Sequence, residues 1–383
     1  MIKAQYLRGS SPSSNFFFLC YKIKKDLPVV DTTWSSEVSV CFLARNLPAC
    51  EVRSLRKKQY SAHAQSGFTL IELMIALALG LLIVAAGLAV FLGSSRSLNL
   101  QSGQSELQQN ANFGLSLVAY DLRHTNLNTV SSQRVNNITL GSGIIFKKEN
   151  LPTPLQSTAN LETELVTLQA KDTDNTTGKS DRLTIQYTPA TNSVFNCEGA
   201  QVLNASSKVV VQRYYVAETP QQVIGEPTSY SLYCDAGEYP TSGSPAAITG
   251  LGTHGSNSAQ QIMQRVDAFK VRLGVKNPAG QLRYMTISEY EAAMTTLLAA
   301  PACATKTSAS CTDTFLQVAS IHIGILSRST GTIGADASLN TQTTFEVAGS
   351  PVTLTGDAAI NKRYLRQAVN QVVAIRNTLG ASS

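Results

Sequence analysis

The sequence predicts an α+β fold in which one long N-terminal helix packs on an antiparallel β-sheet head. Three observations predict it. The apolar run 68–93 is long enough to span a membrane, and an apolar stripe continues the helical period beyond it. From about residue 128 the pattern changes to short apolar or alternating runs separated by Asn, Gly, Ser and Thr, which is typical of strands and turns.

The run Phe68–Gly93 has the length and the flanks of a transmembrane helix. Its 26 residues would give a helix of roughly 39 Å, against about 30 Å of hydrocarbon in a bilayer. Four basic residues precede the run and favour a cytoplasmic N-terminal side: Arg53, Arg56, Lys57 and Lys58. A cleaved secretory signal has a shorter apolar core, so the run favours a retained helix.

One charge, Glu72, interrupts this run five residues after Gly67. A carboxylate in hydrocarbon is costly, so such a residue indicates function. The string SGFTLIEL at 66–73 resembles the class III signal of type IV pilins and type II secretion pseudopilins. The resemblance implies that a prepilin peptidase cuts after Gly67 and that the new N-terminal residue, Phe68, is N-methylated. It also implies that Glu72 pairs with the N-terminal amine of a neighbouring subunit. A glutamate that reaches the membrane interface is the alternative, and it leaves the rest of the motif unexplained.

The resemblance makes residues 1–67 a leader, which is long beside the leaders of that family. Residues 1–54 have no clear domain pattern, whereas Leu55 opens LRKKQYSAHAQSG, a leader of ordinary length. We expect residues 1–54 to result from a start codon assigned too far upstream. A genuine long leader gives the same mature protein.

The helix is expected to continue, so that residues 68–127 form a transmembrane and amphipathic segment. Its apolar stripe recurs every three or four residues and comprises Leu107, Ala111, Leu115, Val118 and Leu122. We expect this stripe to bury against a sheet and the nearby aromatic residues, Phe113 and Tyr120, to pack in the core. Gly103 and Gly114 weaken the helix and favour a bend.

Residues 128–383 are expected to form a β-rich globular head. Candidate strands are Gly143–Phe146, Arg182–Tyr187, Val209–Tyr215, Ser229–Tyr233, Ala268–Val275, Val318–Leu326 and Gln367–Ile375. A short helix is expected at Ser288–Ala299.

Four segments of the head resemble the PilW family of minor pilins. They are SDRLTIQY (180–187), VDAFKVRLGV (266–275), ASIHIGILSRS (319–329) and YLRQAVNQVVAIRN (364–377). The DLR at Asp121–Arg123, near the end of the first helix, fits the same family. Each segment is short, and their order behind a pilin-type N-terminus carries the resemblance, which implies a pilin-like fold.

The net charge of +6 lies entirely before the apolar run. Residues 1–67 contain 10 Lys and Arg against 4 Asp and Glu, and the remainder contains 21 of each kind. A nucleic-acid-binding protein needs a basic surface, so no direct nucleic-acid binding is expected of the head.

Four cysteines follow the apolar run, and an even number suits two disulfides in an oxidising compartment. They are Cys197, Cys234, Cys303 and Cys311. Three pairings are possible, and we favour the local one, Cys197–Cys234 with Cys303–Cys311. Buried free thiols are the alternative.

The sequence predicts no catalytic, metal or cofactor site. None of the histidines (His63, His124, His254 and His322) has metal-ligand spacing. GxSxG, phosphate-loop and HExxH motifs do not occur. The sequence therefore favours interaction over chemistry.

The PilW resemblance implies a minor pilin that helps to initiate type IV pilus assembly at the filament tip and so supports twitching motility, adhesion or DNA uptake. The partners it implies are the prepilin peptidase, other minor and major pilins, and the inner-membrane assembly platform. It implies an inner-membrane location with the head in the periplasm, and then a place in the pilus at the cell surface. Two alternatives stay open: a GspJ-like minor pseudopilin of type II secretion, and a membrane-anchored surface-binding protein that does not polymerise.

Overall fold

The computed structural model describes residues 17–22, 39–44 and 68–378, apart from 132–133, 158–160, 171–179, 253–258, 304–310, 312–313, 333–340 and 355–360. The chain divides into two compact units, Met1–Ala76 and Leu77–Ser383. In the first unit, β1 (Phe17–Lys22) and β2 (Ser39–Ala44) form an antiparallel pair.

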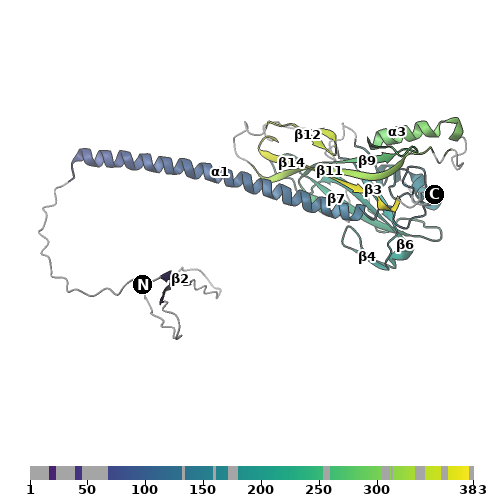
Figure 1. The fold of residues 1–383 in the computed structure, drawn as a ribbon, viewed down its shortest axis with the longest axis horizontal. Helices are drawn as coiled ribbons and strands as arrows, with labels where there is room; N and C mark the ends of the chain where they lie inside the picture. The colour runs from purple at the N-terminus through teal and green to yellow at the C-terminus, as the bar shows by residue number, and fades with distance from the viewer. Residues whose placement is uncertain are drawn as a thin grey trace. The chain divides into compact units, whose positions relative to one another are not determined.

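The helix α1 runs without interruption from Leu70 to Leu122 and enters the head with its C-terminal part (Figure 1). The expected stripe is confirmed: Leu107, Ala111, Leu115, Val118 and Leu122 are all buried. Gly114 is better explained by close packing than by a bend. A Cβ atom at this position would lie 2.9 Å from the Met263 sulfur, so only glycine lets helix and strand approach this closely.

Two four-stranded antiparallel sheets form the head. The first has the order β3-β6-β7-β8 and comprises β3 (Leu183–Tyr187), β6 (Lys208–Glu218), β7 (Tyr230–Pro240) and β8 (Gln260–Gln264). The second has the order β10-β9-β11-β14 and comprises β9 (Val266–Lys276), β10 (Leu282–Thr286), β11 (Gln317–Thr332) and β14 (Tyr364–Ala374). The chain passes from the first sheet to the second at Arg265, between β8 and β9.

Smaller elements complete the head. Two hairpins are formed by β4 (Ser193–Phe195) with β5 (Gln201–Leu203), and by β12 (Thr344–Val347) with β13 (Ser350–Thr353). Besides the four-residue α2 (Leu161–Glu164), the head contains α3 (Ile287–Leu298). A capping box between Thr286 and Glu289 sets the start of α3 one residue before the predicted bound.

The main core joins α1 to both sheets. Ala111, Leu115 and Val118 share one hydrophobic cluster with Ile185 of β3 and Ile323 of β11. Burial of this shared apolar surface therefore stabilises the packing of the sheets on the helix.

Two sequence predictions are wrong. Phe113 and Tyr120 do not pack in the core: their side chains are 63% and 62% exposed. They lie on the face of α1 opposite the buried stripe, where the helical period places residues two or five positions away from a stripe residue. Residues 143–146 form no strand, since Ile144 makes only an isolated bridge to Ile185.

Candidate assembly and processing site

The N-terminal motif lies at the start of α1. Gly67 falls outside the described residues, and Phe68 is 84% exposed. Glu72 occupies the first helical turn, and its backbone N–H donates to the Thr69 hydroxyl at 3.3 Å.

The first half of α1 exposes a continuous apolar surface. Its most apolar 18-residue window has a mean hydropathy of 2.8, and none of that window is buried within the chain. Such a surface needs lipid or other helices to cover it. Glu72 lies in this environment, where a carboxylate requires a partner outside its own head.

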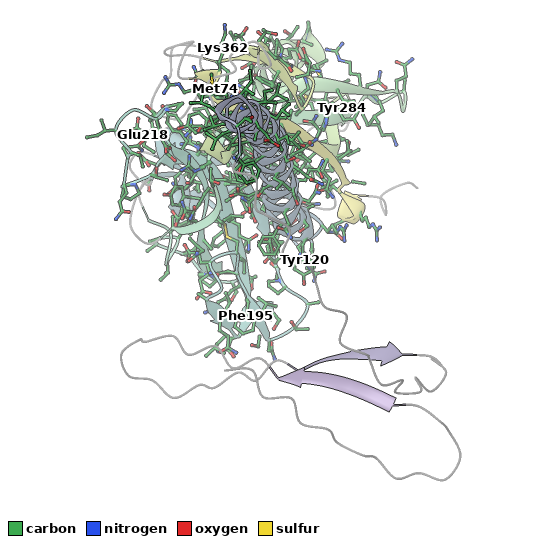
Figure 2. All side chains as sticks on the ribbon, turned by 90° about the vertical axis from the view of Figure 1, so that its left-hand side faces the viewer. Met74, Tyr120, Phe195, Glu218, Tyr284 and Lys362 are labelled. Carbon is green, nitrogen blue, oxygen red and sulfur yellow. A yellow bond between two sulfur atoms is a disulfide. The ribbon has the colours of Figure 1, made fainter. Side chains whose placement is uncertain are left out.

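A second apolar stripe follows the exposed face of α1 beside the head. It comprises Phe113, Leu117 and Tyr120, which are spaced by four and three residues and are 63%, 42% and 62% exposed. Figure 2 labels Tyr120 of this stripe. Helical residues at this spacing lie on one face. The helix therefore presents apolar side chains both to the head and away from it.

The end of α1 is fixed by two of the segments that the sequence singled out. Asp121 of the DLR motif accepts a hydrogen bond from the Tyr214 hydroxyl at 2.7 Å. Burial raises the pKa of the Asp121 carboxyl, and the bond from Tyr214 opposes this shift. From the C-terminal segment, the Asn377 side chain donates to the Thr125 carbonyl at 2.9 Å, while the Asn126 side chain donates to the Asn377 carbonyl.

Charged residues of three of these segments meet in one cluster. Asp267 of β9 binds Arg366 of β14 at 2.6 Å and Arg328 of β11 at 3.3 Å. The side chain of Asp267 is 10% exposed, and those of Arg328 and Arg366 are 1% and 2% exposed. Sequence reasoning missed this cluster. Its only signal was the presence of charged residues in these strands, one each in β11 and β14 and four in β9.

A second buried pair lies in the first sheet. Arg213 of β6 binds Asp235 of β7, and both side chains are fully buried. Arg213 also donates to the Gly252 carbonyl at 2.9 Å, so the pair ties a loop to the sheet. Beside it, burial raises the pKa of Glu198 to about 7, and the Asp235 charge adds to this shift.

The structure pairs Cys197 with Cys234 and Cys303 with Cys311. Their Cα atoms are 6.1 and 4.7 Å apart, within the range that a disulfide needs. These are the pairs that the sequence favoured. The first joins the β4–β5 hairpin to β7, and the second closes the turn after α3. Formation of these bonds in the cell stays a prediction.

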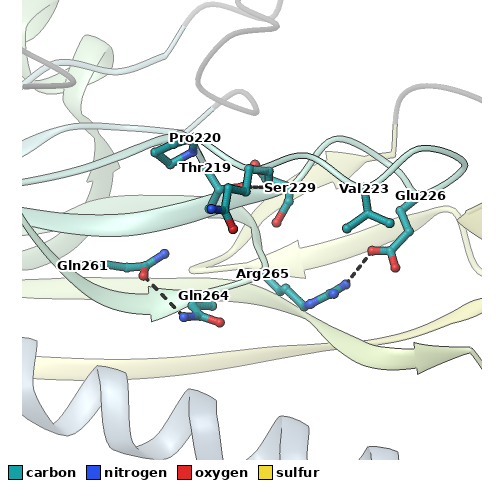
Figure 3. Close-up of a pocket in the computed structure, with 9 residues that line it drawn as sticks. Thr219, Pro220, Val223, Glu226, Ser229, Gln261, Gln264 and Arg265 are labelled. Atoms are coloured by element: carbon teal, nitrogen blue, oxygen red, sulfur yellow. Dashed lines mark hydrogen bonds and ion pairs between the residues drawn. The ribbon is translucent and has the colours of Figure 1, made fainter. Parts of the chain in front are cut away.

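Two pockets lie in the described part of the head. Among the described residues, no group of three His, Cys, Asp or Glu side chains is placed to hold a metal. A cavity of about 250 Å³ lies between Val130, Leu140 and Val209. An open pocket of about 330 Å³ lies beside the β6–β7 loop, lined by Gln261, Gln264 and Arg265 (Figure 3). His124 and His322 contact aromatic rings, Tyr187 and Tyr284 respectively. His63 and His254 lie outside the described residues.

Comparison with known proteins matches both parts of the chain. Residues 62–88 match the prokaryotic N-terminal methylation motif, and residues 213–377 match the family of type IV pilus-assembly protein W, PilW. The chain is therefore similar to PilW-family type IV pilins over these two regions. The matched PilW region contains the ion-pair cluster of Asp267, Arg328 and Arg366. It also contains Asn377, whose side chain donates to the Thr125 carbonyl just beyond the end of α1.

Among solved structures, a type IV-like pilin from Thermus thermophilus is similar to this chain, at 14% identity and a TM-score of 0.23. The match covers 56% of this chain and 84% of the Thermus chain. At that score it adds no argument to the fold described above. No curated protein matches the chain.

Proposed function

We propose that this chain is a minor pilin that helps to initiate type IV pilus assembly and occupies the filament tip. The observation that carries the proposal is the combination of a methylation-type N-terminus with a PilW region in one chain. Removal of 67 leader residues from 383 leaves a mature chain of 316 residues. Most of these residues belong to the head, and a head of that bulk packs poorly along a filament shaft and suits an end.

In this proposal, the prepilin peptidase cuts between Gly67 and Phe68 and methylates Phe68. The mature subunit waits in the inner membrane, with α1 in the bilayer and the head in the periplasm. There it meets other minor and major pilins and the assembly platform. It then leaves the membrane within the pilus, and twitching motility, adhesion or DNA uptake depend on it through the pilus.

Glu72 would supply the attraction that brings subunits together. Cleavage creates a positive amine on Phe68, and in a low-dielectric environment a glutamate of one subunit gains most by pairing with the amine of its neighbour. The exposed stripe of Phe113, Leu117 and Tyr120 gives the same helix a further apolar contact surface beside the head.

The test is Glu72→Ala, with Glu106→Ala as the matched control. Glu106 lies on the same helix beyond the apolar run, where it accepts a hydrogen bond from Thr330. We expect Glu72→Ala to be cleaved, methylated and retained in the membrane, but to be absent from sheared pili on immunoblots. Glu106→Ala should enter pili. Normal incorporation of Glu72→Ala would refute the pairing role, and an intact mass that still includes Gly67 would refute the processing.

A GspJ-like role in type II secretion shares the same N-terminal chemistry and a large head. The neighbouring genes discriminate between the two. Genes for other minor pilins or a tip adhesin favour the pilus, and general secretion genes linked to a secretin favour the pseudopilus. Crosslinking of the chain to other pilins in the membrane would argue against a surface protein that never polymerises.

A further inference from the structure

The loop between β6 and β7, residues 219–229, is held firmly by its own hydrogen bonds. The Gln222 side chain donates to the carbonyls of Thr219 and Ser229, both at 2.9 Å. It also accepts from the Ser229 N–H at 2.7 Å. One glutamine therefore closes the base of the loop from both sides.

Arg265, between β8 and β9, and Arg328 of β11 hold the same loop in place. Glu226 pairs with Arg265 at 2.9 Å, as Figure 3 shows. Arg328 donates to the Pro227 carbonyl at 3.1 Å. A loop fixed at these points presents its outermost residues in a defined direction.

Those outermost residues are apolar and open to solvent. Val223 is 57% exposed and Ile224 is 103% exposed. The Glu226 N–H donates to the Val223 carbonyl at 3.2 Å, and Gly225 has φ of +85°, so the four residues form a tight turn with Ile224 at its corner. Scattered apolar residues on a surface are ordinary. Two adjacent ones on a turn that hydrogen bonds and an ion pair hold in place indicate a contact surface.

The loop lies at the end of the head that faces the apolar half of α1. Beside Arg328 on β11, Thr330 donates to Glu106 of α1 at 2.7 Å, and Gly103 faces Leu365 and Ser329. Ten residues separate Gly103 from Gly93, the end of the apolar run, or about 15 Å along the helix. The opposite end of β6 packs near Leu127, beyond the end of α1.

We propose that Val223 and Ile224 insert into the surface of the lipid bilayer that holds α1, before the subunit leaves the membrane. An apolar turn at this end of the head has the bilayer as the nearest apolar phase along the helix. The charges nearby do not oppose the contact. Beside the turn, Glu226 is paired with Arg265, and Arg328 is paired with Asp267.

The contact would hold the head at a fixed height above the bilayer and would have to break when the subunit enters a filament. The inference rests on insertion of α1 in a bilayer, which the proposed function also requires. It does not depend on whether the filament is a pilus or a secretion pseudopilus.

The chain offers a clean reporter because it contains a single tryptophan, Trp34, before the apolar run. Full chain carrying Trp34→Phe is reconstituted in vesicles of phosphatidylethanolamine and phosphatidylglycerol, with doxyl-labelled lipid as the quencher. Two variants then carry a tryptophan in the turn, one at Ile224 and the other at Val223, so that the turn is probed at two positions. Phe91→Trp in the apolar run is the positive control. Phe195→Trp, on the hairpin that packs near Leu127 and itself 69% exposed, is the negative control.

We expect Ile224→Trp and Val223→Trp to lose fluorescence to a doxyl group near the lipid headgroups and to emit at shorter wavelength than Phe195→Trp. The protein floats with the vesicles if α1 spans the bilayer. If it floats but both loop tryptophans emit like Phe195→Trp, the insertion proposal is overturned and the membrane span is not. A blue shift that appears only after other pilins are added, without quenching by the doxyl lipid, would also overturn it and assign the turn to a subunit contact. Protein that fails to float would overturn both this proposal and the membrane span.

Discussion

Replacing Asp267 with asparagine removes the one carboxylate that Arg328 and Arg366 share. Asparagine keeps the shape of the side chain, but both guanidinium groups then stay buried without their common counter-charge. Breaking a buried ion pair by removing one partner costs about 3–5 kcal/mol. The side chains of Arg328 and Arg366 are 1% and 2% exposed, so water cannot replace the lost charge. We therefore expect Asp267→Asn to lose several kcal/mol of the free energy of unfolding.

The matched control is Glu226→Gln, which removes a carboxylate from the Arg265 pair. There the two side chains are 20% and 23% exposed, so water partly solvates the arginine that is left. An exposed ion pair contributes about 0–1 kcal/mol, and this one should lie near the upper end.

The assay is urea unfolding of the detergent-solubilised protein, followed by far-ultraviolet circular dichroism of the sheets. Urea is uncharged and leaves ion pairs unscreened, unlike guanidinium chloride. On heating, the loss for Asp267→Asn corresponds to roughly 6–20 °C in Tm for a domain of this size class. If Asp267→Asn costs no more than Glu226→Gln, the reasoning from burial is refuted.

Three further predictions follow from the same structure. Burial raises the pKa of Glu198 from 4.5 to about 7, so its stabilising contribution is complete below about pH 4.5 and is lost as the pH rises through about 7. We therefore expect Tm to fall between about pH 5 and pH 8 more steeply in the unmodified protein than in Glu198→Gln, and equal slopes would contradict the shift. Intact mass of the mature chain from Phe68 after alkylation should show Cys197, Cys234, Cys303 and Cys311 labelled only after reduction; labelling of all four without reductant would exclude the two disulfides. Gly114→Val should destabilise the head by about 1–3 kcal/mol, because its side chain meets Met263, whereas Gly80→Val on the same helix meets nothing within 4 Å and should leave head unfolding unchanged.

The sequence predicted the local features of this chain well, because each depends on a short pattern. The buried stripe of α1 follows from its period, and its five predicted residues are buried. The strands at β3, β6, β9, β11 and β14 follow from apolar runs bounded by turn residues, and each lies where the sequence placed it. The processing motif is a string of eight residues and needs no tertiary information.

What the sequence did not reveal depends on contacts between distant segments. Phe113 and Tyr120 were expected in the core because aromatic residues usually bury, but the helical period already placed them opposite the stripe. The short strands β8 and β10 lack enough alternation to stand out, and their pairing with longer neighbours makes them strands. Gly114 weakens an isolated helix, and only the facing Met263 shows why a glycine is needed there.

The ion-pair cluster shows the same limit at the candidate site. Asp267, Arg328 and Arg366 lie up to 99 positions apart, and no pattern along the chain links them. The sheet order β9-β11-β14 brings them together across three adjacent strands. The charged residues in these strands were visible, but their partners depended on a topology that the sequence left undetermined.

The most direct test of the central claim is a count of surface pili in a clean in-frame deletion, with the activity of secreted enzymes measured in the same strain. A minor pilin that primes assembly predicts loss of pili with secretion intact, restored by the full chain and not by Glu72→Ala. Normal pili with lost secretion would contradict the pilus role and assign the chain to the secretion pseudopilus.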